Sequence, residues 1–170
     1  MRYIAAMLLL AGLAVPTVAA ESSAPATTST SVAVTGWRLE CGSTATAVSC
    51  HLLDQIVQAS NGGLVIGFTL APASDGKDVL TILVPLDASL RTPIALSISG
   101  GPSQSFSYAT CSQQGCYAIG PVNGDLLNAM RSGKGDLHVT YGLLDSNLVE
   151  HGINASLSLT GFPEVYARLK

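Results

Sequence analysis

The fold class of this chain is decided by the stretch Gln104-Ser-Phe-Ser-Tyr-Ala-Thr-Cys-Ser-Gln-Gln-Gly-Cys-Tyr-Ala-Ile-Gly-Pro121. In Phe106-Ser-Tyr108 apolar and hydroxyl side chains alternate, as they do in a strand with one buried face. Residues 112–115 form a short loop that ends in glycine, which accepts a left-handed backbone. Cys111 and Cys116 flank this loop, so the stretch predicts a β-hairpin clamped across its turn.

The rest of the chain repeats this pattern. Short apolar or alternating segments are separated roughly every 8–12 residues by clusters of Gly, Pro, Asn, Asp or Ser, which is typical of β-sandwiches and barrels rather than of βαβ units. We therefore expect an all-β fold, mainly an antiparallel β-sandwich with one or two short helices. The expected strands are residues 34–41, 48–57, 64–71, 79–85, 94–99, 104–111, 116–121, 137–144 and 148–160.

Two short helices are expected beside the sheets. The first runs from about Asn123 to Arg131, because Asn123 can cap it and Gly133 can stop it. The second follows Phe162-Pro163, since proline is accepted in a first helical turn. We interpret both helices as elements that pack on the sheets, and we expect Trp37 in the core.

The first twenty residues have the features of a cleavable export signal. Arg2 precedes the apolar run from Ile4 to Val15, and small residues follow up to Ala20, where we expect the cut. The run is shorter than the roughly 20 residues that span a bilayer, so we expect no transmembrane segment after cleavage. Residues 21–32 are mostly Ser, Thr, Ala and Pro and predict a flexible leader. Residues 33–170 then suit a single domain.

Composition argues against two classes of partner. The chain has 8 Lys and Arg residues against 11 Asp and Glu, and only 11% of its residues are charged. Nucleic-acid binding needs clustered cations that displace counterions, and a polybasic membrane-surface site needs a similar cluster. The basic residues here are few and scattered, so we expect neither partner.

The four cysteines fall into two local pairs, Cys41 with Cys50 and Cys111 with Cys116. Four cysteines allow three connectivities, and we expect the two local ones because short loops close at the least entropic cost. In an exported protein such bridges are structural and stabilise by roughly 2 to 3 kcal/mol each in the loop-closure model. A redox centre or a zinc site is the alternative, although no Cys-x-x-Cys unit occurs and His51 is the only histidine beside a cysteine.

The sequence contains no recognisable catalytic constellation. His51, His138 and His151 lack metal-ligand spacing and lie in expected strands, where pairing could bring His138 near the last strand. No G-x-S-x-G elbow occurs, and Asp75 and Asp78 flank a turn in which solvated carboxylates are ordinary. We predict no catalytic, cofactor-binding or metal-binding residues. The alternative is a periplasmic hydrolase whose acids are distant in sequence, as in glycosidases.

Several segments occur in the order of a known family. They are Trp37-Arg-Leu-Glu-Cys41, Cys50 followed by Gln55, Val84-Pro-Leu-Asp87 leading into Leu90 and Ile94-Ala-Leu-Ser-Ile98, Tyr108-Ala-Thr-Cys111 with Gly115-Cys116, Leu126-Leu127 to Gly133, and Thr160-Gly-Phe162. Over about residues 34–169 this order resembles the bacterial invasion-associated locus B family. One departure is Asp87, where the family tends to have glycine.

The resemblance implies a β-sandwich-like protein of the periplasm or cell envelope of Gram-negative bacteria, or a secreted one. The family takes its name from a role in host-cell entry, and it supplies no catalytic residues that could be assigned here. We therefore expect an exported protein that is not an enzyme and needs no cofactor. Its expected partner is an unknown protein or envelope component, or a host-cell surface.

Overall fold

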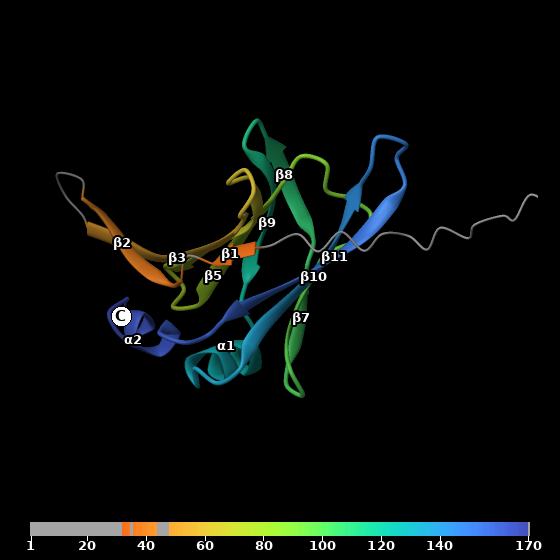
Figure 1. Ribbon diagram of the computed structural model, residues 1–170. Helices are drawn as coiled ribbons and strands as arrows, with labels where there is room; N and C mark the ends of the chain where they lie inside the picture. Colours follow the sequence, from red (N-terminus) through yellow and green to blue (C-terminus); the bar gives the residue numbers. More distant parts are fainter. Residues whose placement is uncertain (1–31, 35, 44–47, 170) are drawn as a thin grey trace, which may run out of the picture.

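The structure, a computed structural model, describes residues 32–34, 36–43 and 48–169 (Figure 1). The expected signal peptide, and the expected leader up to residue 31, lie outside these residues. The elements of the described part are β1 (Val32–Val34), β2 (Arg38–Ser43), β3 (Val48–Gln58), β4 (Leu64–Pro72), β5 (Asp78–Val84), β6 (Ile94–Ile98), β7 (Ser103–Phe106), β8 (Tyr108–Ser112), β9 (Gly115–Pro121), α1 (Gly124–Arg131), β10 (Asp136–Leu144), β11 (Glu150–Ser158) and α2 (Phe162–Tyr166). Across the described ranges, no helix has both the length and the apolar character to cross a bilayer.

The strands form two antiparallel sheets. The larger has seven strands in the order β1-β3-β4-β5-β9-β8, with β2 also paired to β3. The smaller has four strands in the order β11-β10-β6-β7. Figure 1 shows β2, β3 and β5 on one side of the molecule and β7, β10 and β11 on the other. The expected fold class, an antiparallel β-sandwich with two short helices, is confirmed.

Period-two alternation along the strands builds one core between the sheets. In β5, Leu80, Ile82 and Val84 are fully buried, while the residues between them are partly exposed. From the smaller sheet, Ile94 and Leu96 of β6 are buried in the same cluster. Burying one such side chain stabilises the fold by roughly 1.5–3 kcal/mol. This alternation therefore fixes which face of each strand turns inward.

Helix α1 begins where the sequence predicts. The Asn123 side chain accepts a hydrogen bond from the backbone N–H of Leu126 at 2.8 Å, which satisfies one of the unpaired donors of the first turn. Leu126 and Met130 are buried, and the helix ends at Arg131. Its apolar face packs against the core of the sandwich, as expected.

Helix α2 and the tryptophan pack together. The rings of Trp37 and Phe162 meet edge to face, with their centroids 4.8 Å apart. Trp37 is 8% exposed, and its indole Nε1 donates to the carbonyl oxygen of Ser158 at 3.2 Å. The expected core position of Trp37 and the expected second helix, with Pro163 in its first turn, are both confirmed.

The two carboxylates of the 73–78 turn differ in their surroundings. Asp75 is exposed and accepts a hydrogen bond from the backbone N–H of Lys77 at 3.1 Å, as expected of a turn residue. The expectation that Asp78 is also solvated is wrong. Asp78 is 2% exposed and accepts a hydrogen bond from the Tyr166 hydroxyl. Helix α2 brings Tyr166 onto Asp78, so the carboxylate is buried and holds the end of this helix by a hydrogen bond.

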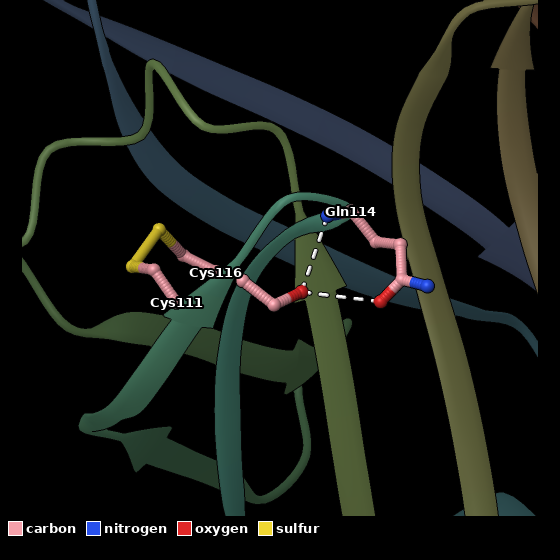
Figure 2. Close-up of a disulfide and its surroundings, with 4 residues drawn as sticks. Cys111, Gln114 and Cys116 are labelled. Atoms are coloured by element: carbon pink, nitrogen blue, oxygen red, sulfur yellow. Dashed lines mark hydrogen bonds between the residues drawn. A yellow bond between two sulfur atoms is a disulfide. The ribbon is translucent and has the colours of Figure 1, made fainter.

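Both disulfides are local, as expected. Cys41 bonds to Cys50 across β2 and β3, and Cys111 bonds to Cys116 across β8 and β9. Figure 2 shows the second bridge, beside which the hydroxyl of Ser112 accepts a hydrogen bond from the backbone N–H of Gln114 at 3.1 Å. All four cysteines are thus oxidised, which leaves no thiolate for the redox or zinc alternatives.

Three strand predictions differ from the structure. The expected strand 104–111 is two strands, because the chain leaves the smaller sheet after Phe106 and enters the larger one at Tyr108. The expected strand 34–41 also spans two elements, because the short strand β1 ends at Val34 and β2 begins only at Arg38. The last strand, expected at 148–160, runs from Glu150 to Ser158. It begins later because residues 145–149 form a tight turn closed by the Asp145 N–H to Val149 C=O hydrogen bond.

Candidate functional site

Exposed apolar side chains gather at one end of the sandwich. The described residues expose five large hydrophobic side chains, and four of them lie in two neighbouring loops. Leu86 and Leu90, 60% and 56% exposed, lie in segment 85–93 between β5 and β6. Leu148 and Val149, 77% and 52% exposed, lie in the turn between β10 and β11. We call these four residues the apolar end.

A cleft links the two loops of the apolar end. Leu86, Leu90 and Leu148 line an open hollow of about 480 Å³. The disulfide between Cys111 and Cys116 lies in its wall. In Figure 1 the β8–β9 hairpin and the β10–β11 turn lie at the top of the view, and both helices lie at the bottom. The hollow has room for a few side chains of a partner.

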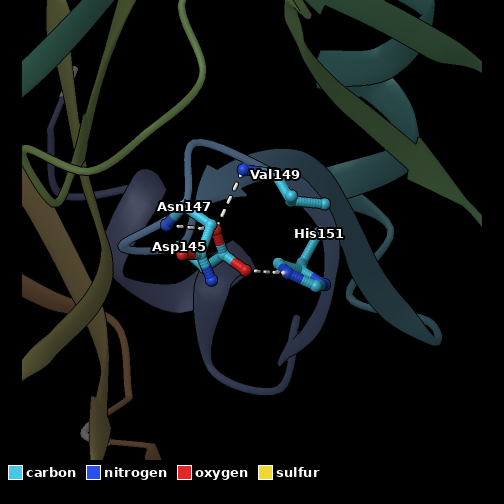
Figure 3. A network of polar contacts seen from close by, with 4 residues as sticks. All are labelled: Asp145, Asn147, Val149 and His151. Atoms are coloured by element: carbon cyan, nitrogen blue, oxygen red, sulfur yellow. Dashed lines mark hydrogen bonds and ion pairs between the residues drawn. The ribbon is translucent and has the colours of Figure 1, made fainter.

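A single carboxylate holds the turn that carries Leu148. One oxygen of Asp145 accepts hydrogen bonds from the backbone N–H groups of Asn147 and Val149, at 2.8 and 2.9 Å. Its other oxygen lies 3.0 Å from Nε2 of His151 (Figure 3). The hydrogen bond from His151, followed by that from Val149, holds the pKa of the Asp145 carboxyl below its ordinary value. The turn is therefore built around an ionised aspartate.

Leu148 itself has a backbone conformation that is unusual for its type. Its φ of 61° is the only positive value among the described residues other than glycine. A branched side chain in this left-handed region costs roughly 1–2 kcal/mol. Residues held in such conformations cluster at functional sites. The turn thus presents a mostly exposed leucine at an energetic cost.

A second carboxylate ties the two loops together. Glu150 accepts hydrogen bonds from the hydroxyl groups of Ser89 at 2.6 Å and Thr92 at 2.7 Å. These two bonds lower the pKa of the Glu150 carboxyl. A side chain at Gly142 would collide with Glu150, because a Cβ there would lie 2.5 Å from its carboxylate oxygen. Glycine on β10 therefore allows the carboxylate to reach across to segment 85–93.

A second hollow of about 360 Å³ adjoins the first along β8. It shares Leu90 and Cys111 with the first hollow and is also lined by Tyr108. The Tyr108 hydroxyl is buried and finds no hydrogen-bond partner in the described part of the chain. Burial, followed by the nearby Glu150 charge, raises the pKa of the Tyr108 phenol. The phenol therefore stays neutral and can only donate or accept a hydrogen bond here.

The three histidines lie apart from one another in the described part of the chain. His138 lies between two hydroxyls on the outer face of the smaller sheet, with Nε2 2.8 Å from Ser99 Oγ and Nδ1 2.9 Å from Ser156 Oγ. Pairing does bring His138 next to the last strand, but the residue opposite is Ser156 and not a histidine. Serine hydrolases also pair a serine with a histidine. Among the residues that the structure describes, the His138 ring contacts Ser99 and Ser156 but no carboxylate, and His138 lines neither of the two hollows.

The remaining histidines have other surroundings. His151 pairs with Asp145 in the turn described above. His51 lines a separate hollow with Cys50, whose sulfur is in the disulfide. Over residues 32–34, 36–43 and 48–169, no three His, Cys, Asp or Glu side chains converge to hold a metal ion.

Sequence reasoning missed the apolar end. Leu86 and Leu90 lie between Pro85 and Pro93, and both prolines are residues that end strands. Leucines in such a loop were the signal in the sequence for exposed apolar side chains. Leu148 was placed inside an expected strand. The Asp145-Ser-Asn147 run before it is turn chemistry and could have moved the boundary.

Comparison with known proteins adds the family. A family model described as "Invasion associated locus B (IalB) protein" matches residues 37–170. No curated protein matches the chain. The crystal structure of invasion associated protein B from Bartonella henselae superposes with a TM-score of 0.67 at 22% sequence identity, covering 78% of this chain and 89% of that one. At this identity the structural match supports the shared fold. The family match covers most of the described domain, and the chain belongs to the invasion-associated locus B family.

Proposed function

We propose that this chain is an exported cell-envelope protein that binds a partner protein through its apolar end and is not an enzyme. The observation that carries the proposal is the gathering of exposed apolar side chains on two hydrogen-bonded loops, where Leu86, Leu90 and Leu148 line one hollow and Val149 is exposed next to Leu148. Exposed apolar patches with a polar rim are characteristic of protein interaction sites. Fixed loops also lower the entropy that binding has to remove.

The charges around the apolar end favour a protein over a lipid surface. Asp87, Asp145 and Glu150 lie on or beside these loops, with Arg91 as the nearby cation. A site for anionic lipid needs several clustered cations, each contributing about 1 kcal/mol. The mixed, mostly acidic rim suits a partner that inserts one or two apolar side chains into the hollow and keeps polar groups at its edge.

Export is supported by the sequence and by the sulfur chemistry. Residues 1–20 have the pattern of a cleavable signal, and two structural disulfides are typical of proteins from oxidising compartments such as the periplasm. Sequencing the N-terminus of the protein recovered from the cell envelope tests this step. We expect the mature chain to begin at Glu21, and a chain that keeps residues 1–20 would contradict it.

Binding is tested by removing apolar side chains from the exposed loops. The variant Leu90→Ser/Leu148→Ser should bind solubilised envelope proteins at least about tenfold more weakly, since truncating buried anchor residues costs about 2 kcal/mol or more. Ile119→Ser is the matched control, because Ile119 is exposed but lies on β9 outside the apolar end. Equal binding by the wild-type chain, the double variant and the control would count against the proposal. Hydrolysis of a generic ester or glycoside that is lost in His138→Ala would favour the hydrolase alternative instead.

A further inference from the structure

One edge of the smaller sheet has open backbone groups, and the hydrogen bonds show which residues supply them. In an antiparallel pair, opposite residues alternate between those that exchange hydrogen bonds and those that do not. At one end of the β10–β11 ladder Asp145 N–H donates to Val149 C=O at 3.0 Å, and at the other Leu159 N–H donates to Gly135 C=O at 3.3 Å. The register between these ends has no shift. Odd-numbered residues of β11 therefore bond to β10.

The even-numbered residues of β11 consequently direct their N–H and C=O groups away from the sheet. An independent contact supports this parity, because the carbonyl oxygen of Ser158 accepts the indole N–H of Trp37 from outside the ladder. Trp37 thereby closes one end of the edge. No described residue pairs with the backbone of Glu150, Gly152, Asn154 or Ser156. The open stretch thus runs from Glu150 to Ser156.

Three other edge strands, β2, β8 and β7, have features that discourage further pairing, and β11 largely lacks them. The exposed strand β2 carries the charged pair Arg38 and Glu40. The edge strand β8 has a register shift next to its disulfide. The strand β7 is short, and the side chain of its own residue Gln104 bonds to the backbone of residues 121 and 123, which lie beside it. Charges, bulges, short length and covering groups are the usual protection of edges. In contrast, β11 is nine residues long and has no charged side chain after position 151.

We propose that the open edge of β11 pairs with the same edge of a second copy of this chain, antiparallel about a two-fold axis at Ile153. The stretch from Glu150 to Ser156 is centred on Ile153, so only this register uses every open group. Glu150 then faces Ser156, and Gly152 faces Asn154. Each of the four residues contributes one N–H and one C=O, which allows about eight hydrogen bonds between the copies.

The chemistry of the strand suits its own copy. No like charges face each other in this register, and like charges directly opposite would be destabilising. Ile153 is half-buried on the inner face, and in the pair it meets the Ile153 of the other copy. The two four-stranded sheets would join into one of eight strands. Because the contact is isologous, it closes at a dimer and leaves no open β11 edge.

Paired charge variants test this register. Gly152→Lys/Asn154→Lys places lysines opposite lysines across the two-fold axis, and a side chain at Gly152 meets no atom within 4 Å in the monomer. We expect sedimentation equilibrium to show a dimer for the mature wild-type chain and roughly tenfold weaker dimerisation for this variant. Gly152→Glu/Asn154→Glu should weaken it similarly. Mixing the two variants should restore a dimer that contains one copy of each, which also shows that both are folded.

The control places the same charges away from the edge. Ala95→Lys/Ser97→Lys adds two lysines with the same spacing to the outer face of β6, which lies two strands away from the edge of β11. This variant should dimerise like wild type. A wild-type chain that sediments as a monomer at every soluble concentration would overturn the proposal. So would a dimer that ignores the edge charges, or a mixture that forms no heterodimer. None of these substitutions touches the apolar end.

Discussion

Replacing Leu148 by glycine tests whether Leu148 serves the stability of the fold or the binding of a partner. At the Leu148 φ of 61°, glycine relieves roughly 1–2 kcal/mol of left-handed strain. Two terms oppose this gain. Glycine adds about 0.5–1 kcal/mol of unfolded-state freedom. The leucine side chain is 77% exposed, so the burial that is lost is about a quarter of roughly 1.5–3 kcal/mol. The terms nearly cancel, and the free energy of unfolding should stay within about 1 kcal/mol of wild type.

Urea denaturation followed by the fluorescence of Trp37 measures this quantity. Trp37 is the only tryptophan of the chain, and it is buried against Phe162. Leu148→Ala is the matched variant, because it removes the same side chain but keeps a Cβ in the left-handed region. It should be less stable than Leu148→Gly by about 0.5–1 kcal/mol. Both variants should lose partner binding to the same extent. A loss of more than about 2 kcal/mol in Leu148→Gly would show that Leu148 supports the fold, and would refute the reasoning.

Three further predictions concern the loops around the apolar end. Replacing Cys111 and Cys116 by serine together should lower the free energy of unfolding by about 2 kcal/mol in the loop-closure model for so short a separation, which urea denaturation would measure; an unchanged value would contradict it. The lowered carboxyl pKa values of Asp145 and Glu150 mean that their stabilising hydrogen bonds are complete above the ordinary values of 3.8 and 4.5 and are lost as pH falls through the lowered values. Amide exchange should therefore show the 145–149 turn opening on acidification, and protection that is independent of pH there would disprove this. Finally, Gly115→Ala should cost about 3 kcal/mol or more, because its φ is 146° and a Cβ would lie 2.3 Å from a carbonyl oxygen of β5; a melting temperature equal to wild type would be inconsistent with that contact.

Features that depend on neighbouring residues in the sequence could be predicted. Helix α1 was recognised because its cap at Asn123 and its stop at Gly133 are local signals. The disulfides were recognised because each joins two strands that follow one another in a hairpin. The period-two pattern likewise indicated the sandwich, because burial on one face is sufficient to produce it.

Features that depend on distant residues could not be predicted. The sequence contains no signal for the change of sheet at Ser107, because Phe106 and Tyr108 both fit a half-buried strand in either sheet. Glu150 bonds to Ser89 across 61 positions, and no spacing rule connects them. Asp78 is buried because α2 returns to cover it, bringing Tyr166 from 88 positions away. The apolar end depends on such a contact, because Glu150 holds the turn between β10 and β11 beside segment 85–93.

Site-specific photo-crosslinking in intact cells tests the central claim most directly. A photoreactive phenylalanine analogue placed at position 148 should form an adduct with one protein partner, whereas the same analogue at position 119, also exposed but outside the apolar end, should not. The adduct should disappear when Leu90→Ser is added to the position-148 protein. Adducts of equal yield and identity from both positions, or none from position 148, would contradict a partner site at the apolar end.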